Sequence, residues 1–147
     1  MNPLNSDETA IRPYSRKANY YETDQMGIIH HSNYILWFEE ARVDFMEQLG
    51  FGYKKIVGSN IDIALLNVYC EYKSMVRFGD IVDIHMSVSE LTPTRMTVNY
   101  EIFDALSHEL RTIGKTQHFF YDNEKKRPVS LKKALPELFE LLSSLQK

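Results

Sequence analysis

The sequence predicts an α+β fold in which one antiparallel β-sheet wraps around a single long helix. Three patterns lead to this prediction: a helical apolar stripe in the first third of the chain, several segments of period two after it, and a short helical stripe at the end. The 147 residues are 44% hydrophobic and 25% charged, as in an ordinary globular domain. Folding a chain of this length buries roughly two-thirds of its surface, so a core can form without disulfides or metal.

The first ordered element is expected near Tyr14. Residues 1–13 are mostly polar, show no periodicity and end at Pro13, which predicts a flexible leader followed by a single domain over residues 14–147. The segment from Tyr14 to Tyr21 is expected to form a strand.

A long helix is expected over residues 33–49, where apolar side chains recur at steps of three and four. The residues of this stripe are Tyr34, Phe38, Ala41, Phe45 and Leu49. Ile35, Trp37 and Met46 widen the stripe, which predicts a helix that is packed on several sides. Gly50 supplies a natural C-terminal stop.

The following segments alternate between apolar and polar residues and predict strands. Residues 81–91 and 94–103 show the clearest alternation, and Thr92 and Pro93 between them predict the turn of an antiparallel hairpin. Residues 62–73 and 110–121 are also rich in β-formers, with Gly114 as a candidate bulge or close approach. Residues 52–58 are expected to be a short link between the long helix and the first of these strands.

The last helix is expected to begin at Pro136 and not at Ser130, because proline is tolerated in the first helical turn and damaging deeper inside a helix. Its apolar stripe consists of Leu138, Leu141, Leu142 and Leu145. We interpret this stripe as packing against the sheet.

Charge and composition exclude several classes of function. A net charge of −3 gives no excess of basic residues for nucleic acid. No window of about 18 apolar residues predicts a membrane span, and the N-terminus lacks the basic and apolar regions of a secretory signal. The lone Cys70 can form neither a disulfide framework nor a zinc cage. These observations predict a protein that stays in the cytoplasm.

The residues best suited to catalysis lie between the first strand and the long helix. Asp24, Gly27, His30 and His31 occupy this short segment. Backbone N–H groups in the first turn of a helix lack partners inside the helix and carry partial positive charge, so they can polarise a carbonyl. A thioester or ester carbonyl bound there would develop its negative charge facing preorganised donors.

This segment resembles the opening motif of hot-dog-fold acyl-CoA thioesterases. It is most similar to the 4-hydroxybenzoyl-CoA thioesterase family and its relatives from the Tol-Pal gene cluster. The matching residues are Tyr21, Thr23, Asp24, Gly27, Ile28, Ile29, His31, Asn33, Tyr34, Phe38, Glu39, Ala41 and Arg42. The resemblance continues at Phe78, Gly79 and Asp80 and covers roughly residues 14–125. It departs from the family at His30, where the closest subgroup usually has tyrosine.

The resemblance implies a hot-dog fold and a thioesterase that hydrolyses an acyl-CoA to a free acid and coenzyme A. It implies that Asp24 is the catalytic carboxylate, as nucleophile or general base, and that the backbone N–H of His31 polarises the carbonyl. The candidate substrate-binding residues of the motif are Gly27, Ile28, His30, Asn33 and Tyr34. No cofactor is implied, since coenzyme A arrives with the substrate. The resemblance also implies a homodimer or homotetramer with active sites between subunits.

Several alternatives remain open from the sequence. The substrate could be an acyl-carrier-protein thioester, or the chain could bind acyl thioesters without turnover. Glu39 and Glu40 are rivals to Asp24, although Glu39 can pair with Arg42 on the helix surface. His31 fits a structural role as well as a catalytic one, and adjacent histidines without further ligands at suitable spacing argue against a metal site. The candidates for contacting coenzyme A phosphates are Lys73, Arg77, Arg95, Lys125, Lys126 and Arg127.

Overall fold

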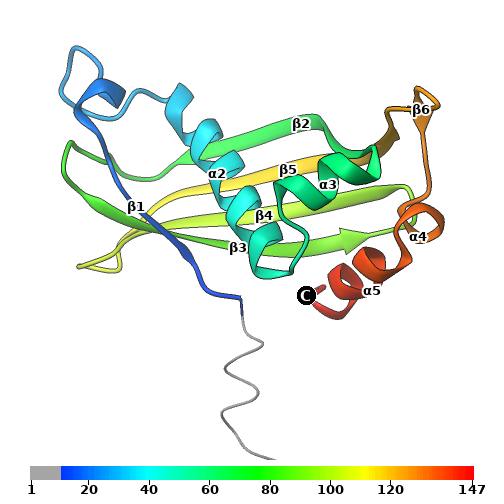
Figure 1. Ribbon diagram of the computed structural model, residues 1–147. Helices are drawn as coiled ribbons and strands as arrows, with labels where there is room; N and C mark the ends of the chain where they lie inside the picture. The colour runs from blue at the N-terminus through cyan, green and yellow to red at the C-terminus, as the bar shows by residue number, and fades with distance from the viewer. Residues whose placement is uncertain (1–10) are drawn as a thin grey trace, which may run out of the picture.

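The computed structural model describes residues 11–147 and shows one curved sheet with a long helix across its concave face (Figure 1). The chain begins with β1 (Tyr14–Lys17), the 3-10 turn η1 (Tyr20–Glu22) and the long helix α2 (Ser32–Gln48). The short helix α3 (Tyr53–Ser59) leads into the strands β2 (Ile61–Tyr72), β3 (Ile81–Leu91), β4 (Arg95–Asp104) and β5 (Leu110–Asp122). The chain ends with β6 (Arg127–Pro128), α4 (Leu131–Ala134) and α5 (Pro136–Ser144).

The sheet has the order β1-β3-β4-β5-β2, with β6 paired to β5, and every pairing is antiparallel. The predicted hairpin of β3 and β4 and the predicted strands β2 and β5 are confirmed. A sheet wrapped around one long helix is the hot-dog arrangement, so the expected fold class is also confirmed.

The core lies between α2 and the concave face of the sheet. Helix α2 buries its stripe there because apolar side chains gain free energy on leaving water. The buried residues of the helix are Tyr34, Trp37, Phe38, Ala41 and Phe45. The Phe38 ring stacks on Tyr100 of β4 with ring centroids 4.3 Å apart.

Gly114 is a point of close approach and not a bulge. It pairs in regular register with Tyr100 on one side and Cys70 on the other. A Cβ atom at this position would lie 2.2 Å from Cζ of Phe38, so only glycine leaves room for the ring. The irregularities of the sheet lie elsewhere, between Leu65 and Asn67 of β2 among other places.

Four local predictions need correction. The expected link at residues 52–58 contains α3, a helix of only seven residues whose side chains are all at least partly exposed. The first strand ends at Lys17, because the chain turns into η1 at Tyr20. The short strand β6 and the one-turn helix α4 were not predicted; the Ser130 hydroxyl caps α4 by accepting a bond from the Lys133 amide. Helix α5 begins at Pro136, as predicted.

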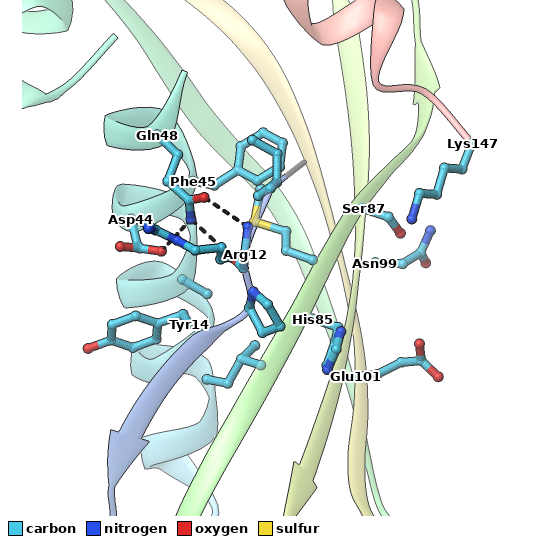
Figure 2. A pocket seen from close by; sticks show the side chains of 15 residues that line it. Arg12, Tyr14, Asp44, Phe45, Gln48, His85, Ser87, Asn99, Glu101 and Lys147 are labelled. Atoms are coloured by element: carbon cyan, nitrogen blue, oxygen red, sulfur yellow. Dashed lines mark hydrogen bonds between the residues drawn. The ribbon is translucent and has the colours of Figure 1, made fainter. Parts of the chain in front are cut away.

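The expected flexible leader over residues 1–13 falls largely outside the described residues. Ile11 packs against the core, and the backbone of Arg12 forms two hydrogen bonds with the amide of Gln48 on α2. Figure 2 shows these bonds at the edge of a cavity of about 230 Å³ between residues 11–14, α2 and β3. Within residues 11–147, no helix is both long and apolar enough to cross a membrane.

Candidate active site

Asp24 lies in a tight turn between η1 and α2. The Asp24 carboxylate accepts a bond from the Met26 amide at 2.8 Å, and the Gly27 amide donates to the Asp24 carbonyl at 3.0 Å. Gly27 has a φ of +79°, a conformation that favours glycine and allows the chain to reverse here. Ile28 then accepts a bond from the Asp24 amide. The side chain of Asp24 is half-buried, so its second carboxylate oxygen is available to a ligand.

The start of α2 is organised by His30. The Nδ1 atom of its imidazole lies 2.8 Å from the hydroxyl of Ser32 and accepts a bond from the Ser32 amide, which satisfies one of the N–H groups of the first turn that lack a partner inside the helix. The ring of His31 stacks on that of His30 with centroids 4.1 Å apart. Within residues 11–147, the His31 backbone amide and imidazole donate no hydrogen bond to the protein. That amide is a free donor at the positive end of a 17-residue helix.

A buried carboxylate, which sequence reasoning missed, holds this loop from behind. Glu22 is 4% exposed. It accepts bonds from Arg16 at 2.7 Å, from the Asn19 amide at 2.9 Å and from Nε1 of Trp37 at 2.8 Å. The Arg16 guanidinium also lies over the Trp37 ring, 4.6 Å from its centroid. The network ties β1, the loop of Asp24 and α2 together.

The remaining motif residues divide between loop and core. The Asn33 side-chain amide donates to the backbone carbonyls of Glu22 and His30, so the residue closes the loop onto the helix. Tyr34 is 3% exposed and its ring packs against Trp37 and Tyr72; burial raises the pKa of its phenol. Asn33 is half-buried in the loop, and Tyr34 belongs to the core.

Tyr72 is a second residue that the sequence did not reveal. It closes β2, and its hydroxyl donates to the His31 carbonyl at 3.0 Å. This bond fixes the peptide that follows the free amide of His31. A tyrosine at the end of a predicted strand gives no signal of such a role, because the partner lies 41 positions away.

The helix carboxylates behave differently from the expectation. Within residues 11–147, Arg42 forms no ion pair with Glu39; its guanidinium donates instead to the Tyr100 hydroxyl. Glu40 pairs with Arg16 and accepts a bond from the hydroxyl of Tyr14. The Glu40 carboxylate is therefore engaged by Arg16 and Tyr14, whereas Glu39 is exposed on α2.

The candidate phosphate-binding residues do not gather at one place. Lys73 and Arg77 lie in the loop after β2, at the same end of the sheet as η1, and Ile28 forms a β-bridge with Arg77. Arg95 and the β5–β6 hairpin that carries Lys125, Lys126 and Arg127 lie at the opposite end (Figure 1). Of these six residues, Arg77 is the one whose backbone pairs with the loop that follows Asp24. No group of three His, Cys, Asp or Glu side chains within residues 11–147 is arranged to hold a metal.

Comparisons with known proteins place the chain in a family. The family model described as the thioesterase-like superfamily matches residues 19–139. A hypothetical protein from Aquifex aeolicus, known from its crystal structure, is 36% identical to this chain. The alignment covers 88% of this chain and 98% of that protein, with a TM-score of 0.81. The DHNA-CoA thioesterase from Staphylococcus aureus is 31% identical to this chain. The alignment covers 90% of this chain and 89% of that protein, with a TM-score of 0.85. The acyl-CoA thioester hydrolase YbgC of Escherichia coli is 22% identical over 132 residues, 90% of this chain and 98% of that protein.

Proposed function

Because this chain belongs to the thioesterase-like superfamily, we propose that it hydrolyses acyl-CoA thioesters to a free carboxylic acid and coenzyme A. The observation that carries the proposal is the pairing of two groups on one short loop. These are the carboxylate of Asp24 and the unpartnered amide of His31 at the start of α2. Thioester hydrolysis needs a base or nucleophile and a donor for the developing oxyanion.

The His31 amide supplies the oxyanion donor in this proposal. When an oxygen nucleophile attacks the thioester carbon, the carbonyl oxygen gains negative charge. A free N–H at the positive end of α2 stabilises that charge without first having to reorganise. The Tyr72 hydroxyl and the His30 imidazole both bond to the peptide group that follows this amide and hold it in place.

Asp24 acts in one of two ways. As a general base it takes a proton from water, whose oxygen attacks the carbonyl carbon; the C–S bond then breaks and the thiolate leaves. As a nucleophile it attacks the carbon itself; the C–S bond breaks, the thiolate leaves and a mixed anhydride remains, which water cleaves to the free acid and the Asp24 carboxylate. After a single turnover in H₂¹⁸O, label in the peptide that contains Asp24 would establish the nucleophilic route, because it arises only when water cleaves the anhydride at the Asp24 carbonyl.

We further propose that two copies of the chain build each complete site. Three cavities of the single chain lie around α2: one beside residues 11–14 and β3, one beside α3 and β2, and one along the helix itself. Neither Asp24 nor His31 lines any of the three. The side chains around the loop are open to solvent, with Tyr21 82% and Met26 71% exposed. A second copy that covers this loop would supply the missing wall for the acyl group.

The decisive experiment is thiol release from a panel of short, long, branched and aryl acyl-CoAs with the variant Asp24→Asn. An asparagine oxygen can still accept the bond from the Met26 amide, so the turn is expected to survive. We expect kcat/KM to fall by about 10²–10⁴-fold while the circular dichroism spectrum is unchanged. Asp122→Asn is the matched control, since Asp122 caps the β5–β6 turn through the amides of Glu124 and Lys125.

The same panel decides between the alternatives. Near wild-type turnover in a folded Asp24→Asn variant would refute the catalytic role. Cleavage of acyl-carrier-protein thioesters without cleavage of acyl-CoAs would replace the proposed substrate. Binding of acyl-CoA without thiol release would make the chain a binding protein.

A further inference from the structure

A second site, distinct from the loop of Asp24, lies beneath the C-terminal half of α2. Here a cavity of about 380 Å³ runs between α2, α3 and β2 and reaches toward β3, β4 and α5. This volume is within the range of cavities that hold small molecules. Most of the lining is apolar and includes Val43, Met46, Ile56, Val57 and Ile63. The mouth is also apolar, since Val43, Tyr53 and Val57 are exposed there.

One cation lines this apolar cavity. Arg42 is half-buried, and its guanidinium donates a bond of 3.0 Å to the hydroxyl of Tyr100. Tyr100 lies 2.7 Å from the Thr116 hydroxyl, which lies 2.8 Å from Nε2 of His118. Tyr100, Thr116 and His118 are each about 1% exposed or less. The guanidinium is thus anchored at the end of a buried hydrogen-bonded chain.

That chain provides no negative charge. Its members are a phenol, an alcohol and an imidazole, and burial raises the pKa of the Tyr100 phenol, which keeps it neutral. Glu39 and Asp62 also line the cavity, but both residues are exposed, and within residues 11–147 neither forms an ion pair with Arg42. Within residues 11–147 the Arg42 guanidinium therefore has a hydrogen-bond partner but no ion-paired carboxylate. Partial burial of a cation without a counter-charge costs free energy, which a bound anion would offset.

We propose that the cavity binds a monocarboxylic acid with a hydrophobic body, its carboxylate on Arg42 and its chain along the apolar walls. A fixed guanidinium with free N–H groups matches a carboxylate, and the walls match an alkyl or aryl chain. The choice of acid rests on the proposed function, whose product has this chemistry. Arg42 lies ten residues beyond Ser32, about 15 Å along the helix axis, so the site is separate from the first turn of α2 in the same chain.

The test uses decanoate and isothermal titration calorimetry. We expect wild-type protein to bind decanoate and Arg42→Met to bind it about 10- to 100-fold more weakly, as loss of a charge-assisted bond predicts. Arg42→Lys should restore part of the affinity. Arg95→Met is the matched control, because Arg95 is exposed at the start of β4, and its affinity should equal that of wild type. Decan-1-ol should bind wild type as weakly as decanoate binds Arg42→Met.

Methyl NMR of the wild-type protein locates the ligand even if Arg42→Met does not fold. Decanoate should shift the resonances of Val43, Met46, Ile56, Val57 and Ile63. Three outcomes would each overturn the proposal. These are shifts confined to other residues, equal affinities of wild type and a folded Arg42→Met, and absence of binding because a second copy covers the mouth. Asp24→Asn separates this proposal from the proposed function: it should lose turnover and bind decanoate as wild type does.

Discussion

Two acidic residues, Asp24 and Glu22, lie two positions apart and have opposite surroundings. The Asp24 carboxylate accepts one backbone bond and is half open to solvent. The Glu22 carboxylate accepts three bonds and is buried under the loop. The exposed acid is the one available for chemistry, and the buried acid fixes the backbone that presents it.

Glu22→Gln should destabilise the protein strongly. Three donors point at the two oxygens of the Glu22 carboxylate, and the variant replaces one of these oxygens with an NH₂ group, which is itself a donor. The variant also removes the closest charged partner of the buried Arg16. Breaking a buried ion pair from one side costs about 3–5 kcal/mol. Glu40→Gln is the control, because Glu40 pairs with the same arginine from a side chain that is 40% exposed, and such pairs contribute about 0–1 kcal/mol. Urea unfolding measures both free energies; equal losses would contradict a special role for Glu22.

His118 should make stability depend on pH. Burial, with a smaller contribution from Arg42, lowers its pKa from 6.5 to about 4. The unfolded chain therefore binds a proton at a higher pH than the folded chain. The free energy of unfolding does not depend on His118 above about pH 6.5. As the pH falls toward 4, protonation of His118 in the unfolded chain lowers it by about 3 kcal/mol.

This pH dependence is measured by urea unfolding of wild type and His118→Asn at several values between pH 4.5 and 7.5. The variant should lose the part of the slope that His118 contributes, whatever its absolute stability. Parallel pH profiles for the two proteins would show that the imidazole does not carry the effect.

At the scale of elements, α2 and β5 meet through the ring of Phe38 and the bare backbone of Gly114. The ring lies between that backbone and the stacked Tyr100. Because an added Cβ would fall 2.2 Å from Cζ of Phe38, this pair sets how closely the helix approaches the sheet. The helix carries Asp24's loop at one end, so the same contact positions the candidate site.

Gly114→Ala should therefore destabilise the protein by about 1–3 kcal/mol, the usual cost of overpacking a core. Gly58→Ala is the matched control in α3, where an added Cβ meets nothing within 4 Å; it should be neutral or slightly stabilising. Thermal unfolding compares them. Adding Phe38→Leu to Gly114→Ala should recover part of the loss, and additive losses in the double variant would contradict the contact.

At the scale of the whole molecule, the two edges of the sheet differ. β1 covers one edge with four residues, whereas β2 offers twelve residues that pair only with β5 within the described chain. Leu65, Leu66, Tyr69 and Tyr72 are all more than 40% exposed along this edge. A long apolar edge strand invites pairing with another chain, and Tyr72 contacts the candidate site directly.

We therefore expect the variant with Leu65→Lys and Leu66→Lys to shift a dimer to monomers and to lose most thioesterase activity. Light scattering after size exclusion gives the mass, and thiol release gives the activity. Leu106→Lys is the control, since Leu106 is 87% exposed in the β4–β5 turn, away from this edge. A monomeric wild type with full activity would contradict a site shared between copies.

The sequence by itself determined the fold class, the long helix, the four long strands and the family, because these depend on periodicity and on a motif with fixed spacing. It also placed Asp24 and His31 on one loop, since they are neighbours in the chain. Only the tertiary structure revealed Glu22, Tyr72 and the Arg42–His118 chain. Tyr72 and Arg42 have partners 41 and 58 positions away, and local patterns carry no information on which distant side chains folding brings within hydrogen-bond distance. The partners of Glu22 are 3 to 15 positions away, but apolar periodicity does not show that the chain turns a carboxylate inward to meet them.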